Sequence, residues 1–251
     1  MAVVDLAQLE NLDAKSVIIA DGSAQLSLRL QAIQQAALEL GIQSGLYKGQ
    51  TLIERALDRM APMLYQSYNF NALTLQNNIL PPVIETGYNQ SNVSANARKV
   101  TVNGQVYHIV KQAHFVSNVP TWRDYLITGF TKPAIPDRSV LPQNDTEKTL
   151  WKKEVQYGWQ QGIVQACDIF KQNMHRLNRD FRGMIMYYQL VNRDMMLPPY
   201  VHSQSKAIVH NSDNLSIDNH LLDLQVLPQF QSNASRWQAI LKPLAGKIDA
   251  K

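Results

Sequence analysis

Three aspartates have the side chain that acid–base chemistry would need: Asp124, Asp137 and Asp145, which lie in or beside a proline-containing segment. Hydrolysis by a carboxylate pair requires two such groups a few ångströms apart, with one protonated and the other charged. Neither a shared motif nor a shared helix face brings any two of the three together. We therefore expect no catalytic residue, and a hydrolase is the weakest of the functions considered.

Metal and thiol chemistry have equally little support in the sequence. The histidines are scattered, and none forms a His-Glu-x-x-His motif or has a carboxylate one helical turn away on a credible face. They are His108, His114, His175, His202, His210 and His220. The single cysteine, Cys167, excludes an intrachain disulfide, and its place in a helical pattern predicts a small buried side chain. We expect neither a metal nor a cofactor.

Nucleotide and nucleic-acid binding are also weakly supported. No Gly-x4-Gly-Lys-Ser/Thr loop, no Gly-x-Gly-x-x-Gly motif and no Gly-x-Ser-x-Gly nucleophile motif occurs. The net charge of +4 is mild for 251 residues, and the basic residues are interspersed with acidic ones. Trp122, Trp151, Trp159 and Trp237 occupy positions typical of a core. A basic nucleic-acid-handling module remains the alternative interpretation.

The overall composition is that of a globular protein. Apolar residues make up 45% of the chain, enough for an ordinary buried core. No apolar run approaches the roughly 20 residues that span a bilayer, and the first residues lack the basic and apolar regions of a signal peptide.

The most informative pattern is an internal repeat. When the sequence is compared with itself at an offset of 117 positions, two motifs of the first half align with two of the second. A loop that is two residues shorter in the second half then changes the offset to 115. The aligned motifs are Gly41–Gly45 with Gly158–Gly162, Leu80-Pro81-Pro82 with Leu197-Pro198-Pro199, and Phe115-x-Ser117-Asn118-x3-Trp122 with Phe230-x-Ser232-Asn233-x3-Trp237. Such repeats are typical of pseudo-symmetric units. The sequence thus predicts an α+β fold in which two units merge into one core.

In the first unit, apolar periodicity predicts helices over 24–48 and 51–74, with Pro62 as a kink. Gly41, Gly45 and Gly49 lie four residues apart, which indicates a notch where another helix crosses closely. The double proline then forces an extended exit. Asn103-Gly104 predicts a tight hairpin turn. The apolar face of that hairpin would comprise Val100, Val102, Tyr107 and Ile109.

The second unit repeats this order, with helices predicted over 145–173 and 174–195. Asn144 followed by Glu147 matches a helix-capping pattern. A weaker turn is predicted at Asp218-Asn219. The apolar face of this second hairpin would comprise Leu215, Ile217, Leu222 and Leu224.

These patterns set the expected boundaries. A strap would occupy residues 1–22, the first unit 23–122, a connector 123–144, the second unit 145–240 and a tail 241–251. The connector contains Pro133, Pro136 and Pro142 and should cross the surface as extended chain.

Several motifs in order, between about residues 30 and 230, resemble a known family. They are Ile79-Leu80-Pro81-Pro82-Val83, Thr121-Trp122-Arg123-Asp124-Tyr125-Leu126, Leu141-Pro142-Gln143-Asn144, Gly183-Met184-Ile185-Met186-Tyr187 and Pro198-Pro199-Tyr200-Val201. The chain resembles the DotC family, outer-membrane lipoproteins of type IVB (Dot/Icm-like) secretion systems, whose counterpart on I-type conjugative plasmids is TraI.

The resemblance implies a non-enzymatic periplasmic scaffold in a ring with DotD-like and DotH-like partners, moving protein or DNA. Family members are held at the outer membrane by a lipidated N-terminal cysteine. This sequence departs from that pattern because its single cysteine is Cys167. Either the lipid anchor lies outside this sequence, or protein contacts alone hold this member.

Overall fold

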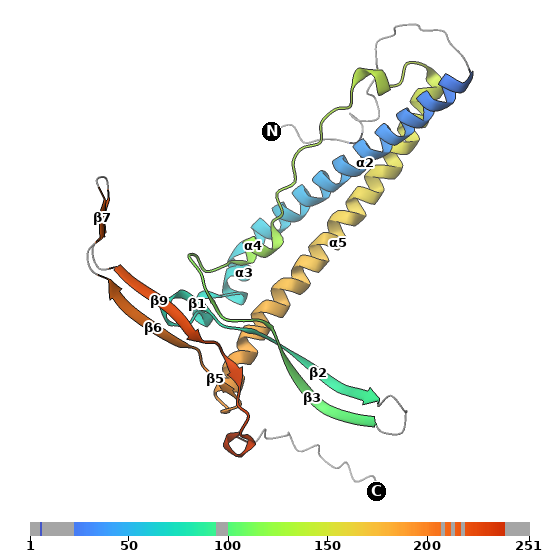
Figure 1. Cartoon of the computed structure of the whole chain (residues 1–251). Coiled ribbons are helices and arrows are strands. Elements are labelled where there is room, and N and C mark those ends of the chain that lie inside the picture. Colours follow the sequence, from blue (N-terminus) through green and yellow to red (C-terminus); the bar gives the residue numbers. More distant parts are fainter. Residues whose placement is uncertain are drawn as a thin grey trace. The chain divides into compact units, whose positions relative to one another are not determined.

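The chain has an α+β fold, as predicted, and is described by a computed structural model (Figure 1). The structure describes residue 6 and residues 23–93, 100–206, 209–211, 214–216 and 219–238. Two compact units are present: unit 1 holds Met1–Tyr68 and Thr121–Leu177, and unit 2 holds Asn69–Pro120 and Asn178–Lys251. Apart from Leu6, the predicted strap and tail lie outside the described residues.

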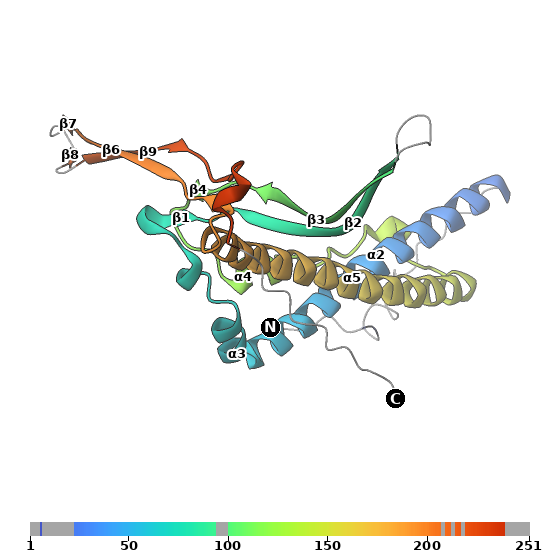
Figure 2. The same cartoon turned by 90° about the horizontal axis from the view of Figure 1, so that it is seen from below.

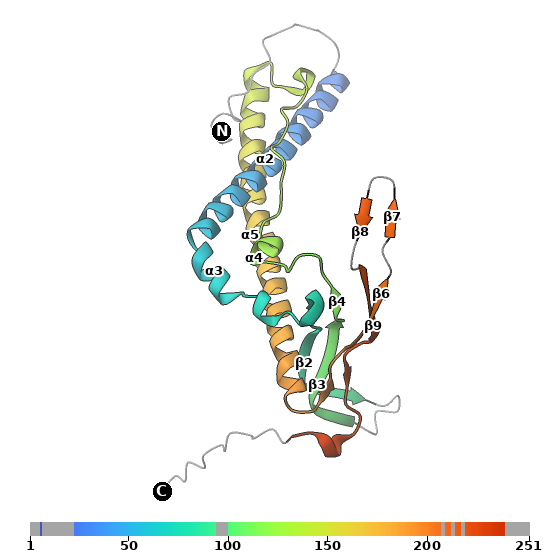
Figure 3. The same cartoon turned by 90° about the vertical axis from the view of Figure 1, so that its left-hand side faces the viewer.

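Unit 1 is built on two long helices, α2 (Ser23–Arg59) and α5 (Asp145–Val191), which lie side by side and run in the same direction (Figures 1 and 3). Their contact uses the predicted glycine notch. A Cβ added at Gly41 would lie 2.5 Å from the Val155 carbonyl oxygen and 3.1 Å from the Gly158 Cα, while one at Gly45 would overlap the backbone of Trp159. The helix backbones thus touch where no side chain intervenes.

The same contact is reciprocal. A Cβ at Gly158 would meet the carbonyl of Leu38, and one at Gly162 would meet the carbonyl of Ile42. The glycines that align in the sequence repeat therefore face each other across the helix pair.

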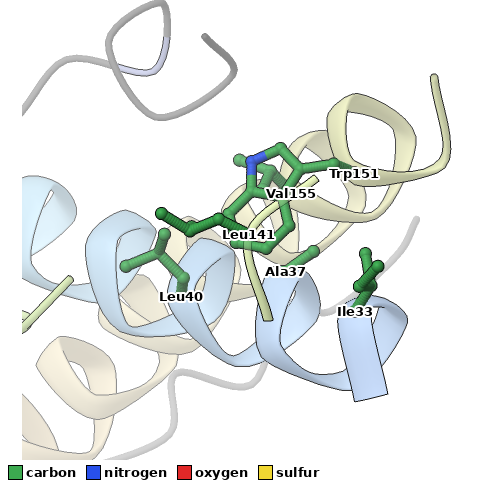
Figure 4. Packing of buried hydrophobic residues seen from close by; sticks show 6 residues of the cluster. All are labelled: Ile33, Ala37, Leu40, Leu141, Trp151 and Val155. Atoms are coloured by element: carbon green, nitrogen blue, oxygen red, sulfur yellow. The ribbon is translucent and has the colours of Figure 1, made fainter. Parts of the chain in front are cut away.

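A hydrophobic cluster fills the space beside this crossing (Figure 4). Its buried members are Ile33, Ala37, Leu40, Leu141, Trp151 and Val155. Leu6, the one described residue of the predicted strap, packs against the cluster together with Trp159. Leu141 reaches it from the connector, so the connector returns to the helix pair.

The helix boundaries differ from those predicted. The first helix does not end at residue 48, because Gly49 packs against Ala166 and the modest helix penalty of glycine is outweighed. It ends at Arg59, and α3 (Ala61–Ser67) follows with a proline in its first turn. Pro62 cannot donate to the preceding turn, which explains the break.

The break predicted near residue 173 is wrong. α5 continues through it to Val191, because neither proline nor glycine lies between Gln172 and Asn178. Within the part of the chain that the structure describes, no helix combines the length and the apolar character of a bilayer span.

The predicted connector, residues 123–144, begins inside the short helix α4 (Trp122–Leu126), which the sequence did not predict, and it holds one 3₁₀ turn, η3 (Arg138–Val140). Otherwise it runs without regular structure from Ile127 to Asn144, in agreement with the extended chain that its prolines predict. Figure 1 shows it beside the helix pair.

Unit 2 begins with the 3₁₀ turns η1 (Asn71–Leu73) and η2 (Gln76–Asn78). All its described strands form two-stranded sheets. β1 (Ile79–Leu80) pairs with β4 (His114–Phe115), and the long β2 (Val83–Val93) pairs with β3 (Val100–Lys111). After α5, β5 (Met196–Leu197) pairs with β10 (Gln229–Phe230), and β6 (Tyr200–Lys206) pairs with β9 (Asn219–Val226). β7 (Val209–Asn211) pairs with β8 (Asn214–Ser216), and η4 (Ala234–Arg236) follows (Figure 2).

Both predicted turns are wrong. Asn103 and Gly104 lie inside the continuous strand β3, where Asn103 pairs with Gln90. Asn219 lies in β9, opposite Lys206. In each case a local turn signal is overridden by a longer ladder, which pairs more backbone groups than a tight hairpin would.

The predicted hairpin faces change with the turns. Val100 and Val102 pair with Val93 and Ser91 of β2, and Leu215 lies in β8 opposite His210. Tyr107 and Ile109 do pack against the core of unit 2. Ile217 lies outside the described residues.

The two strand systems of unit 2 share one pairing scheme. In each, a two-residue strand precedes Pro-Pro and pairs with a two-residue strand far along the chain: Ile79 opposite Phe115, and Met196 opposite Phe230. In each, the long ribbon begins with an irregular register, between Val83 and Ile84 and between Tyr200 and Val201. These positions are again 117 residues apart, or 115 for the partner strand.

The core of unit 2 forms where the end of α5 meets the strands. Ile84, Tyr187, Leu190 and Met196 are buried together. Gly183 makes the approach close, because a Cβ there would lie 2.5 Å from Val83 Cγ1 and 2.8 Å from the Ile84 nitrogen.

We expect Gly45→Ala to lower the free energy of unfolding by roughly 1–3 kcal/mol, because the added methyl group meets backbone atoms of α5 that cannot move aside. This loss exceeds the gain of about 1 kcal/mol from helix propensity. Urea unfolding of the variant and of the parent protein measures this loss. Gly129→Ala is the matched control, since no atom lies within 4 Å of its added Cβ. Equal stabilities of the two variants would contradict the close crossing.

Replacing either of the two tryptophans that align in the repeat should change the free energy of unfolding by different amounts. Trp122 is fully buried and packs edge-on to Tyr65, so Trp122→Ala should cost roughly 3–5 kcal/mol. Trp237, expected in the core, is instead 43% exposed and donates its Nε1 hydrogen to the Gln231 carbonyl oxygen. We expect Trp237→Ala to change the unfolding free energy far less, as thermal and urea denaturation would both show.

Candidate functional site

The three aspartates considered for hydrolysis each have a local structural role. Asp124 accepts hydrogen bonds from the backbone nitrogen and hydroxyl of Thr121, at 2.6 and 2.9 Å, and so caps α4. Asp137 accepts from the Ser139 nitrogen at 2.8 Å, and these Ser139 hydrogen bonds lower its pKa. Asp145 is fully exposed beside Lys148. No hydrogen bond joins any two of the three, so the structure does not assemble them into an acid pair.

The thiol candidate and three of the imidazole candidates are exposed. Cys167 is exposed, which corrects the expectation that it is buried. It follows the buried Ala166, and one residue of helix turns the side chain away from the core. His108, His114 and His175 are exposed. Among the described residues, no three of the His, Cys, Asp and Glu side chains converge as metal ligands.

The predicted helix cap at the start of α5 is present and extends further than the motif indicated. Asn144 Oδ1 accepts from the Glu147 nitrogen at 2.8 Å, and Glu147 Oε2 accepts from the Gln143 nitrogen at 2.8 Å. Arg29 of α2 donates to both Glu147 oxygens, at 2.9 and 3.2 Å, and to the Ser139 carbonyl. Burial opposes the charge on Glu147, but the bonds from Arg29 and Gln143 outweigh it and hold its pKa below the ordinary value.

A second buried carboxylate, Asp180, was missed by sequence reasoning. It is completely buried in unit 2 and accepts from Lys111 Nζ of β3 at 2.5 Å and from Arg179 at 2.9 Å. Arg179 also lies 3.7 Å from Glu85 of β2. Burial alone would raise the pKa of Asp180, but hydrogen bonds from the two cations lower it. The group therefore stays charged and ties α5 to both strands of the ribbon.

The sequence did carry a signal for Asp180. Leu177, Asp180, Met184 and Tyr187 follow helical spacing, and the other three are buried. A carboxylate at a core position of an apolar stripe indicates a buried charge with a partner, which is the arrangement that the structure shows.

A shallow hollow of about 630 Å³ lies along the exposed face of α5 in unit 1. Its lining residues are Tyr157, Gln160, Gln161, Val164, Gln165, Asp168, Ile169 and Gln172. The one acidic group, Asp168, is paired with Lys171 at 3.0 Å. Its amides and the phenol of Tyr157 offer hydrogen bonds to a protein or ligand.

Buried charges join elements inside each unit, and polar and apolar side chains are presented outward.

Comparison with known proteins agrees with the resemblance seen in the sequence. A family model described as type IV secretory system, conjugal DNA–protein transfer (TraI), matches residues 27–239. The match covers both units and every motif quoted above. A search of curated proteins gave no match.

We expect Asp180→Asn to destabilise the protein by roughly 1–3 kcal/mol at pH 7, because Lys111 and Arg179 lose a buried charged partner. The folded pKa of Asp180 lies below its unfolded value of about 3.9. The stability that the charged Asp180 contributes is thus fully present above the unfolded pKa and is lost as the pH falls through the folded pKa.

Urea unfolding between pH 7 and pH 3 would show the two proteins converging in stability on acidification. Asp168→Asn is the matched control, since its pair with Lys171 is exposed to solvent and contributes little to stability. A constant difference between Asp180→Asn and the parent protein across this range would contradict the assignment.

Proposed function

Because the chain belongs to the TraI family of type IV secretory systems for conjugal DNA–protein transfer, we propose that it is a non-enzymatic structural subunit of the outer-membrane core complex of such a system. Family membership itself gives the coarser statement: the chain is a component of a type IV secretion or conjugation apparatus that works with other subunits.

The close α2–α5 crossing is the observation that carries the structural role. Backbone contact at Gly41, Gly45, Gly158 and Gly162 leaves no room for the helices to slide past one another. Interiors packed in this way transmit strain and resist deformation. A rigid element of this kind suits a subunit whose work is to hold neighbours in place.

The ionisable groups support the same proposal. The buried carboxylates Glu147 and Asp180 are paired with cations, and their lowered pKa values keep them charged at neutral pH. A general acid or base requires a pKa near the working pH, so these two groups are adapted to structure.

We further propose that residues 23–122 and 145–240 are diverged copies of one unit. Three independent features support this: the facing glycines of α2 and α5, the strands around each Pro-Pro, and the irregular register at the start of each ribbon. Duplication gives one chain two similar ribbons, β2–β3 and β6–β9, with which to contact neighbours.

The location and the partners follow from the family resemblance. We propose a periplasmic subunit at the outer membrane, attached through the N-terminal lipid of the family and assembled in a ring with DotD-like and DotH-like subunits. The family description, with its mention of DNA transfer, leaves a nucleic-acid-handling module as the alternative.

Purification of the complex from envelopes solubilised in detergent should recover this chain in a large assembly that contains several different subunits. Native mass and subunit identity are the measurements. The control is a strain that carries only this gene, in which the large assembly should be missing. A monomer without partners in the complete strain would refute the proposal, and DNA binding that weakens steeply with salt would favour the alternative.

A further inference from the structure

An exposed apolar surface covers the junction of α2 and α3 in unit 1, which we call the elbow surface. It comprises Leu52, Met60, Met63 and Tyr65, with Arg55 and Arg59 beside them. The four apolar side chains are 50%, 45%, 52% and 48% exposed, in that order. An exposed patch of large apolar side chains with a charged rim marks an interaction site.

Three of these side chains belong to the end of α2 and the start of α3. Leu52 lies about two turns before the end of α2, while Met60 and Met63, three residues apart, lie at the start of α3. Leu57 and Leu64, which neighbour Met60 in helical spacing, are buried in unit 1 and fix the orientation of the two helices there.

Arg55 and Arg59 are exposed and follow Leu52 by three and seven residues, so helical spacing places their guanidinium groups beside it. Of the neighbouring carboxylates, Asp58 forms an ion pair with Arg123 at 2.8 Å, and Glu54, two residues after Leu52 and on another side of the helix, accepts a hydrogen bond from the neutral Gln50 amide at 3.1 Å. Within the described ranges, no carboxylate forms an ion pair with the exposed Arg55 or Arg59. Two guanidinium groups, one helical turn apart, therefore border the apolar side chains.

We propose that the elbow surface docks an amphipathic helix of another subunit, in which apolar residues follow helical spacing and Asp or Glu residues line one side. Its apolar side would cover Leu52, Met60 and Met63, and its carboxylates would pair with Arg55 and Arg59. This proposal rests on the proposed scaffold function, because it requires a neighbouring subunit.

The composition favours a protein over a membrane. Methionine, tyrosine and arginine are enriched in the centres of protein interfaces, and all three are present here. Interfacial helices sink their apolar face about 5–10 Å into lipid, whereas these side chains are only half exposed.

Site-specific photo-crosslinking in cells that carry the complete transfer system tests the proposal. A benzophenone amino acid at Met63 should form an adduct with another subunit. Mass spectrometry should map that adduct to a segment with apolar residues at helical spacing and adjacent Asp or Glu. The same amino acid at Lys152, exposed on α5, is the control position and should not form this adduct.

Charge reversal supplies the second measurement. Arg55→Glu combined with Arg59→Glu should reduce the yield of the adduct at least about tenfold, since opposite charges at an interface become like charges. Lys152→Glu combined with Lys153→Glu, a matched pair of exposed sites, should leave it unchanged. Circular dichroism and the melting temperature of each purified variant should match those of the parent protein.

An adduct with phospholipid, an adduct with a segment that lacks carboxylates, or no adduct at all would overturn the proposal. Co-sedimentation of the purified protein with phosphatidylglycerol vesicles that is lost in the Arg55→Glu, Arg59→Glu variant would replace it by membrane binding. If the large assembly still purifies with all subunits in any of these cases, only the docking proposal fails. If the assembly itself is missing, the proposed scaffold function fails.

Discussion

The contact between α2 and α5 is the constraint on which unit 1 depends. Two long helices can approach until their backbones touch only where side chains are absent, and Gly41, Gly45, Gly158 and Gly162 provide that space at successive turns. The close approach then determines which residues fill the flanks, among them Trp151 and Leu141. The connector must return to the helix pair because its leucine belongs to this cluster.

Buried charge complements this apolar contact. Arg29 joins the beginning of α2 to the cap of α5 and to the end of the connector. In unit 2, Asp180 joins α5 to β3 through Lys111. A buried ion pair contributes little net stability, yet breaking one is costly because the remaining charge is left without a partner. Such pairs specify which elements meet, a property that a scaffold subunit requires.

The sequence allowed the fold class and several contacts to be predicted, because these depend on periodicity and on residue size. The family was predicted separately, from the resemblance of several motifs. The glycine notch and the Asn144 cap are examples: each follows from a few adjacent residues with one physical requirement. The hairpin turns failed, because Asn103-Gly104 is a local signal and strand pairing in β2–β3 is decided by distant residues. Pairing of this kind has no marker within a short window of sequence.

The burial of single residues could likewise be predicted from the sequence at some positions and not at others. Trp122 and Trp237 align in the repeat, yet the first is enclosed by Tyr65 and neighbouring residues while the second lies near the surface of unit 2. Residues that align in a sequence pattern can have different neighbours in the fold, so the pattern does not indicate which of them is packed in a core. Asp180 shows the converse case, where helical spacing did mark a buried position.

The two-stranded ribbons have a further consequence for solubility. In the ribbons β2–β3 and β6–β9, each strand pairs with one other strand among the described residues. The outer side of each strand is therefore a sheet edge, where backbone groups have no partner strand among these residues. Such edges invite uncontrolled stacking between molecules when the strands are apolar. The stretches Asn89-Gln90-Ser91-Asn92 and His202-Ser203-Gln204-Ser205 are instead polar and hydrophilic. This composition reduces the apolar surface that such pairing between molecules would bury.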